Sequence, residues 1–118
     1  GFPRDQAATA DDLIAGLGQL VKLAHLHGIK IAGGTITATK GLPFYSAEGE
    51  AMRQAVNAWI RTSGRFDTVI DFDAAIRDPA DPLRIRPDLD SGDHVHPNDA
   101  GNQVMADAID LKTFRPRD

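Results

Sequence analysis

Helix-like and strand-like segments alternate along the first two thirds of this sequence, and this alternation most constrains its fold. Residues 11–27 carry apolar side chains at helical spacing, and a short β-branched segment begins at Ile29. A second helix is expected over 47–62, after Ser46 as its cap, and a second strand within FDTVIDF. Helices that alternate with strands favour a parallel sheet covered by helices, and hence the α/β class.

The same spacing predicts how each element begins, ends and packs. Thr9 and Asp12 have capping-box spacing before the first helix, and Gly28 is a typical residue to end it. The centre of the second strand, Val69 and Ile70, is expected to be fully buried. The predicted buried face of the first helix is Leu13, Leu17, Leu20, Val21 and Ala24, and that of the second is Met52, Ala55, Val56, Trp59 and Ile60.

Two parallel strands cannot form a buried sheet alone, because each edge would expose unpaired backbone groups. Either further strands exist, or part of the sheet comes from elsewhere. The chain also starts without methionine. We therefore expect residues 1–118 to be the C-terminal fragment of a single domain.

The segment from Arg77 to Val95 is rich in proline and aspartate, and it predicts a long loop that is either functional or disordered. A last helix is expected to begin at Pro97, which suits the first turn of a helix. Its predicted buried face is Val104, Met105, Ala108 and Ile109.

Composition excludes several classes of function. The net charge of −4 and pI near 5.4 argue against a nucleic-acid-binding surface. No apolar run approaches the roughly 18 residues of a membrane span, and residues 1–10 do not form a signal peptide. The absence of cysteine excludes disulfides and thiolate chemistry.

Asp93 and His96 are the strongest candidates for catalysis. Histidine accepts protons near neutral pH, and a carboxylate bonded to one ring nitrogen fixes the tautomer and stabilises the imidazolium. The alternative is structural: Asp93 closes an Asx-type turn, and His96 only precedes the helix at Pro97.

A metal site is the next alternative, since Asp93, His94 and His96 offer three ligand types within four residues. Alternate residues of an extended segment point apart, and the other histidines, His25 and His27, lie far upstream at a helix end. We expect neither a metal nor another cofactor.

A nucleophile is harder to find. None of the three serines, Ser46, Ser63 and Ser91, lies in a G-x-S-x-G elbow, and each is expected to be structural. Asp71 and Asp73 follow the second strand, and we expect them to be solvated and to cap a short turn. A role near the substrate is the alternative.

The stretch DSGDHVHPNDAG resembles the last motif of the SGNH hydrolases, the GDSL-type lipases and esterases. That motif is Asp-x-x-His, usually followed by Pro-Asn and a small-residue helix, here Asp93, His96, Pro97, Asn98, Ala100 and Gly101. The resemblance extends upstream over nearly the whole chain, and the segment from Ser46 to Gly101 is similar to a bacterial subgroup of secreted acylhydrolases.

The resemblance implies a flavodoxin-like three-layer α/β/α sandwich with about five parallel strands. It also implies ester hydrolysis through an acyl-enzyme, with His96 as general base and then general acid, and Asp93 as its orienting residue. The nucleophilic serine and the oxyanion-hole glycine and asparagine would lie upstream of this chain. We therefore expect the chain alone to be inactive, its substrate to be a lipid, sugar or small ester, and the parent protein to be secreted.

A second class of function also fits the sequence. Unpaired strands are typical of a non-catalytic binding or assembly module whose sheet edge pairs with another chain. The partner would be a second copy of this chain or the N-terminal half of the same protein.

Overall fold

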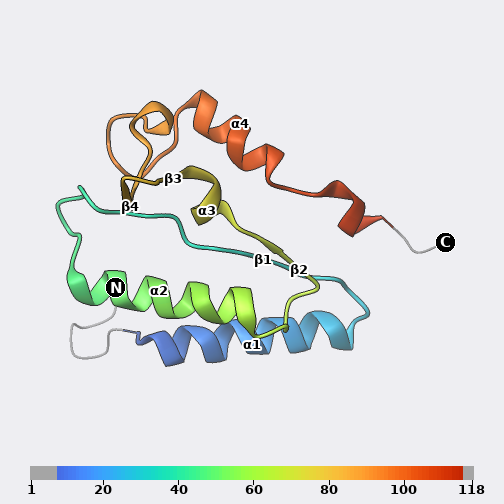
Figure 1. The fold of residues 1–118 in the computed structure, drawn as a ribbon. Coiled ribbons are helices and arrows are strands. Elements are labelled where there is room, and N and C mark those ends of the chain that lie inside the picture. The colour runs from blue at the N-terminus through green and yellow to red at the C-terminus, as the bar shows by residue number, and fades with distance from the viewer. Residues whose placement is uncertain (1–7, 116–118) are drawn as a thin grey trace.

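The computed structural model describes residues 8–115 and has a mixed α/β fold (Figure 1). Helix α1 (Ala10–Leu26) leads into strand β1 (Ala32–Gly34), and helix α2 (Ala47–Thr62) leads into strand β2 (Thr68–Ile70). Figure 1 shows α1 and α2 on one side of the two strands, and the later elements on the other side. The predicted α/β class is confirmed.

Strands β1 and β2 are parallel, with Gly33 opposite Val69. A β-carbon on Gly33 would lie 2.5 Å from the ring of Phe66, so glycine is required for this close approach. In the part of the chain that the structure describes, this parallel sheet contains only these two strands. No helix within residues 8–115 is long and apolar enough to cross a membrane.

The predicted helix ends are confirmed. Thr9 and Asp12 form the reciprocal capping box of α1, and Ser46 accepts a hydrogen bond from the N–H of Gly49 at the start of α2. Gly28 follows α1 with a φ of +68°, a backbone conformation that glycine adopts without strain.

The predicted apolar face of α1 is wrong in part. Val21 is buried, and Leu17 and Ala24 are partly buried. Leu13 and Leu20 are exposed, Leu20 at 56%. Helical spacing identified the apolar stripe, but no element among the described residues covers all of it.

The predicted buried face of α2 also needs correction. Val56 and Ile60 are buried, but Met52 and Trp59 are only partly buried and Ala55 is exposed. The remaining buried positions of this face are polar: Glu50, Arg53 and Asn57. The predicted full burial of strand β2 is wrong as well, since Val69 is 37% exposed and Ile70 only partly buried.

The segment from Arg77 to Val95 is not the long loop that the sequence predicts. After the short helix α3 (Phe72–Ile76), strands β3 (Arg77–Asp78) and β4 (Asp81–Ile85) form an antiparallel pair, and the 3-10 helix η2 is Pro87–Leu89. The prolines misled the prediction, because proline is tolerated in short edge strands. Ile76, Ile85 and Leu89 form a small buried core here.

The last helix begins later than predicted. Helix α4 is Asp99–Asp107, with Asn98 as its N-cap, so Pro97 lies just before the helix. Val104 and Met105 are partly buried against the core of Ile76, Ile85 and Leu89, whereas Ala108 is exposed and Ile109 follows the helix, partly buried. A second 3-10 helix, η3 (Leu111–Phe114), completes the described elements.

Candidate active site

Asp93 and His96 lie on the loop of residues 90–97, which is closed at its base by backbone contacts. Asp90 and Pro97 form an isolated antiparallel bridge, and the N–H of Ser91 donates to the carbonyl of His96 at 3.0 Å. Figure 1 shows β1 and β2 running toward the side of the molecule that carries this loop. In α/β sheets the carboxyl ends of parallel strands are the usual place for ligands.

The two predicted site residues are in direct contact. His96 Nδ1 lies 2.5 Å from Asp93 Oδ2. Asp93 Oδ1 accepts the backbone N–H groups of Val95 at 2.9 Å and His96 at 2.8 Å, and the hydroxyl of Ser91 at 3.1 Å. The Asx-type turn is therefore present, and the same carboxylate that closes it also binds the imidazole.

These bonds favour the ionised form of Asp93. The N–H of His96, the His96 ring and the N–H of Val95 together hold the pKa of the Asp93 carboxyl far below its usual range. A charged Asp93 requires the proton of a neutral His96 to reside on Nδ1, which leaves Nε2 free to accept. The His96 side chain is 75% exposed, so Nε2 is accessible to a reacting group.

The residues after His96 fix the loop onto α4. Asn98 accepts the N–H of Gly101 as the helix cap, and its side-chain amide donates to the carbonyl of Asp88 at 3.0 Å. A β-carbon on Gly101 would lie 2.6 Å from the carbonyl oxygen of Leu89. Asn98 and Gly101 thus have clear structural reasons for their positions in the motif.

Two of the other histidines are bonded to carboxylates of their own. His94 Nδ1 lies 2.7 Å from Asp90 Oδ2, and His25 Nε2 lies 2.8 Å from Asp67 Oδ2, beside the start of β2. Among residues 8–115, no group of three or more possible ligands is placed to hold a metal ion.

The three serines are all engaged in local hydrogen bonds. Ser46 caps α2, and the Ser63 hydroxyl accepts the N–H of Arg65 at 3.3 Å. Ser91 donates to Asp93 Oδ1, the oxygen that does not face the His96 ring. None of these bonds aligns a serine hydroxyl with a histidine nitrogen, as a nucleophile requires.

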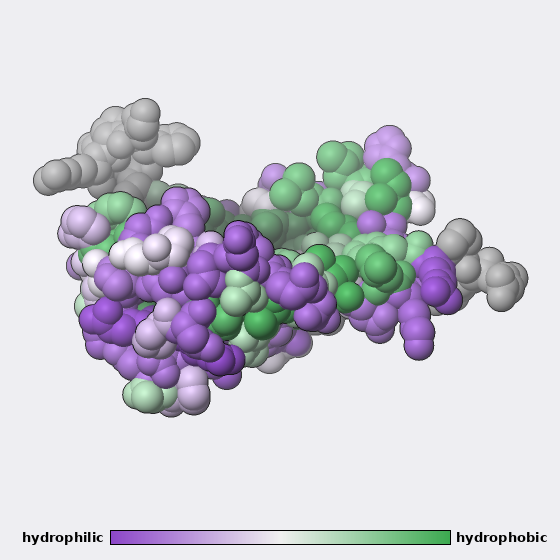
Figure 2. Space-filling model, turned by 90° about the horizontal axis from the view of Figure 1, so that it is seen from above, coloured by the Kyte–Doolittle hydropathy of each residue, from purple (hydrophilic) through white to green (hydrophobic). Residues whose placement is uncertain are grey.

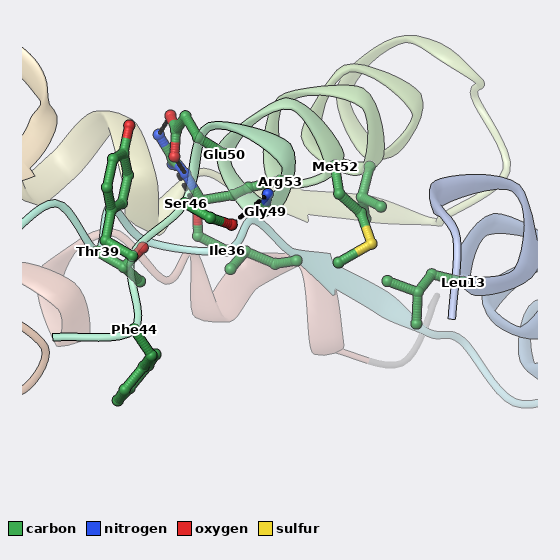
Figure 3. Close-up of a pocket in the computed structure, with 11 residues that line it drawn as sticks. Leu13, Ile36, Thr39, Phe44, Ser46, Gly49, Glu50, Met52 and Arg53 are labelled. Atoms are coloured by element: carbon green, nitrogen blue, oxygen red, sulfur yellow. Dashed lines mark hydrogen bonds and ion pairs between the residues drawn. The ribbon is translucent and has the colours of Figure 1, made fainter. Parts of the chain in front are cut away.

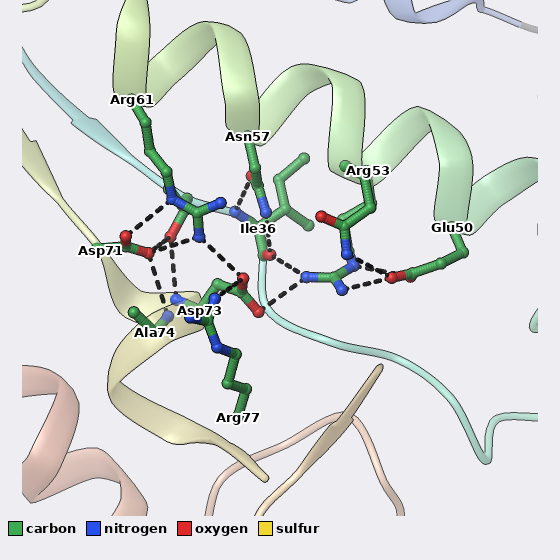
Figure 4. A network of polar contacts seen from close by, with 11 residues as sticks. Ile36, Glu50, Arg53, Asn57, Arg61, Asp71, Asp73, Ala74 and Arg77 are labelled. Carbon is green, nitrogen blue, oxygen red and sulfur yellow. Dashed lines mark hydrogen bonds and ion pairs between the residues drawn. The ribbon is translucent and has the colours of Figure 1, made fainter. Parts of the chain in front are cut away.

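Asp71 and Asp73 are the residues whose surroundings the sequence misjudged. Asp71 does cap α3, by accepting the N–H of Ala74. Asp73 is only 2% exposed, so its expected solvation is wrong. Arg61 bridges the two carboxylates, at 2.8 Å to Asp71 and 2.9 Å to Asp73, and Arg77 adds a 3.2 Å contact to Asp73 (Figure 4).

One buried guanidinium, that of Arg53, completes this network. Arg53 Nη1 lies 2.8 Å from Asp73 and donates to the carbonyl of Ile36 at 3.0 Å, while its other nitrogens bind Glu50 (Figure 4). The Asn57 side chain accepts the backbone N–H of Ile36 and donates to the backbone carbonyl of Ile36. The network joins α2, the end of β1 and α3, and therefore fixes the segment that leads to the loop of residues 90–97.

Apolar surface remains open beside α1 and α2. A pocket of about 220 Å³ lies at the start of α2, lined mostly by apolar groups that include Leu13, Ile36 and Met52 (Figure 3). A neighbouring groove of about 390 Å³ runs between the two helices and β1, past Leu17 and Leu20. Figure 2 shows mainly hydrophilic surface on the left, the end with the loop of residues 90–97, and a mixture of apolar and hydrophilic surface toward the right.

Comparison with known families agrees with this fold. The sequence model of the GDSL-like lipase/acylhydrolase family matches residues 2–109. The chain therefore belongs to the GDSL-like lipase/acylhydrolase family, whose members are hydrolases. No curated protein matches the sequence significantly.

Proposed function

We propose that this chain supplies the general base and its orienting carboxylate to a serine ester hydrolase. The observation that carries the proposal is the pair itself: Asp93 is held as an anion and contacts His96 Nδ1, while the imidazole is open to solvent. The membership of a lipase/acylhydrolase family points to ester bonds as the target.

The geometry supports an acyl-transfer cycle. His96 Nε2 takes the hydroxyl proton of a serine as that oxygen attacks the ester carbonyl. The ester C–O bond then breaks, and the imidazolium gives its proton to the leaving alcohol. A water molecule repeats the two steps on the acyl-enzyme, and Asp93 stabilises the imidazolium at each stage.

The nucleophile in this proposal comes from a segment outside residues 1–118. The three serines of the chain serve as caps or turn contacts, and β1 and β2 offer a sheet edge to which a further strand can be added. The apolar groove between α1 and α2 suits the same serine-bearing segment, which would cover its leucines.

The first test uses the chain as it stands. Purified residues 1–118 are expected not to hydrolyse p-nitrophenyl acetate beyond the rate of the His96→Ala variant. A faster rate that disappears in His96→Ala would show that the chain contains its own nucleophile, and would refute this part of the proposal.

The second test uses the polypeptide that also contains the serine-bearing segment. His96→Ala should reduce kcat by about 10⁶-fold, because it removes the general base, and Asp93→Asn by about 10⁴-fold, because it leaves the base with the wrong tautomer. His27→Ala is the matched control, an exposed histidine at the end of α1. Full activity in both site variants would exclude the proposed roles.

The open sheet edge also favours a second candidate, a non-catalytic assembly module in which two copies of the chain pair. Light scattering after size exclusion measures this directly. A monomer at high concentration would reject self-assembly and leave the hydrolase proposal unaffected.

A further inference from the structure

The loop of residues 90–97 contains a second histidine–carboxylate pair that the proposed mechanism does not use. His94 Nδ1 lies 2.7 Å from Asp90 Oδ2. Asp90 Oδ1 accepts the N–H of Gly92 at 2.8 Å and that of His94 at 3.0 Å. Asp90 therefore holds the two residues that flank Asp93, and its own side chain is 9% exposed, so it is fixed at the base of the loop.

His94 has the conformation that makes the turn possible. Its φ of +68° is the only positive value of a non-glycine residue between residues 8 and 115. A side chain makes this left-handed conformation costly, by about 1–2 kcal/mol. The reversal at His94 brings the N–H groups of Val95 and His96 back to Asp93 Oδ1, so the orientation of Asp93 depends on this unfavourable residue.

The His94 side chain also contacts a distant segment. A β-carbon on Gly41 would lie 3.0 Å from His94 Cγ and 3.1 Å from its Cβ, so the absence of a side chain there leaves room for histidine. The adjacent Lys40 donates its N–H to the carbonyl of Leu83 in β4 at 3.0 Å. The His94 ring is thereby held by Asp90 and packs against a segment that is tied to β4.

We infer that Asp90 and His94 are positioning residues that keep His94 in its left-handed conformation and so aim Asp93 at His96. They act through Asp93 and do not touch the reacting groups. The inference deepens the proposed hydrolase function and rests on it. On this inference, the contact between Asp90 and His94 keeps the Asp93 carboxylate correctly oriented toward the His96 ring.

The test reads the tautomer of His96 in residues 1–118 by long-range ¹H–¹⁵N spectroscopy of the imidazole rings. The native chain should carry the neutral His96 proton mainly on Nδ1, because that nitrogen faces Asp93. His94→Gly permits the positive φ but removes the ring, and Asp90→Ala removes its carboxylate. In both variants the Nδ1-protonated form should lose its majority.

Two further variants separate positioning from a general loss of structure. His94→Asn should restore most of the Nδ1-protonated form, because asparagine tolerates the left-handed conformation and its amide can donate to Asp90. His27→Asn should change nothing at His96. The inference would be overturned if the His96 tautomer were unchanged in His94→Gly and Asp90→Ala. A cooperative thermal unfolding transition would show that both variants are folded.

Activity distinguishes this inference from the function on which it rests. In the polypeptide with the serine-bearing segment, His94→Gly should lower kcat at least tenfold with KM nearly unchanged, and His94→Asn should recover it. If His96→Ala abolishes activity while His94→Gly does not lower kcat, the positioning role fails and the hydrolase function stands. If His96→Ala retains full activity, the hydrolase function itself fails.

Discussion

Gly101 determines how closely α4 can approach the loop that carries Asp93 and His96. A β-carbon there would lie 2.6 Å from the carbonyl oxygen of Leu89 and 2.7 Å from Pro97, and neither backbone nor ring can move without shifting the loop. Gly101→Ala should lower the free energy of unfolding by about 1–3 kcal/mol, as overpacking does.

Gly16→Ala is the matched control for this prediction, since no atom lies within 4 Å of the added carbon. In the middle of α1 this change should stabilise the chain by about 0.5–1 kcal/mol. Urea unfolding measures both variants, and equal effects would contradict the steric argument.

Asp71 predicts how stability depends on pH. Hydrogen bonding from Arg61, joined by bonds from Ala74 and Thr35, outweighs burial and lowers the pKa of Asp71 to about 2. An unfolded aspartate has a pKa of about 3.9, so the folded state binds fewer protons between these values. Its contribution to stability is therefore complete above about pH 5 and is lost as the pH falls toward 2.

Asp71→Asn should make the free energy of unfolding less dependent on pH between 5 and 2. Arg61→Gln should have a similar effect, because it removes the main cause of the lowered pKa of Asp71. Denaturant titrations at several pH values provide the measurement. If the free energy of unfolding fell with decreasing pH as steeply in these variants as in the native chain, Asp71 would not be the source of the pH dependence.

At the scale of the elements, the ion network of α2 matters for stability mainly because its loss would leave buried charges unpaired. Arg53 is buried between Glu50 and Asp73, so Arg53→Ala would leave the buried Glu50 carboxylate without its cationic partner, and Asp73 with only Arg61 and Arg77. Such a loss typically costs about 3–5 kcal/mol.

The exposed pair of Arg86 and Asp88 offers the comparison, because its side chains are 42% and 61% exposed. Arg86→Ala should cost less than about 1 kcal/mol. Thermal and urea unfolding of the two variants should rank them in this order, and a small effect of Arg53→Ala would show that the buried network is dispensable.

The elements differ in how far the sequence predicts them. Caps at Thr9 and Ser46 and both long helices follow from local spacing, and the structure confirms them. The buried face of α2 could not be predicted, since Arg53 and Asn57 read as solvent-facing until the partners from β1 and α3 are known. Strands β3 and β4 were missed because Pro79 and Pro82 argue against strands.

The candidate site was partly predictable for a similar reason. Asp93 and His96 are three residues apart, so one turn decides whether they meet. Asp90 and His94 have an equally local spacing, but the positive φ of His94 and its contact with Gly41 arise from the folded loop. The sequence therefore identified Asp93 and His96 as a pair but did not reveal that Asp90 and His94 hold the loop around them.

On the scale of the whole molecule, the apolar face of α1 predicts separate effects on stability and association. Leu20 and Leu23 are 56% and 54% exposed, so Leu20→Glu and Leu23→Glu should change the free energy of unfolding by only about 0.5 kcal/mol. Leu20→Glu should, however, weaken binding of the proposed serine-bearing segment, because that segment would cover the groove that Leu20 lines.

Val21 provides the control on the same helix. It is 1% exposed, so Val21→Glu should unfold the chain instead of only weakening association. Light scattering and urea unfolding together separate the two effects. A strong loss of stability in Leu20→Glu would show that the leucine is already packed in the isolated chain.

The short sequence distance between Asp93 and His96 has a consequence for the order of folding. Contacts within the loop of residues 90–97 close few residues and can form early, whereas pairing of a sheet with a distant strand closes a long loop and forms late. If a separate segment supplies the serine, as we propose, Asp93 and His96 would meet before that serine reaches them. Hydrolysis would then begin only when the last long-range contacts form, and a partly folded enzyme would be inactive.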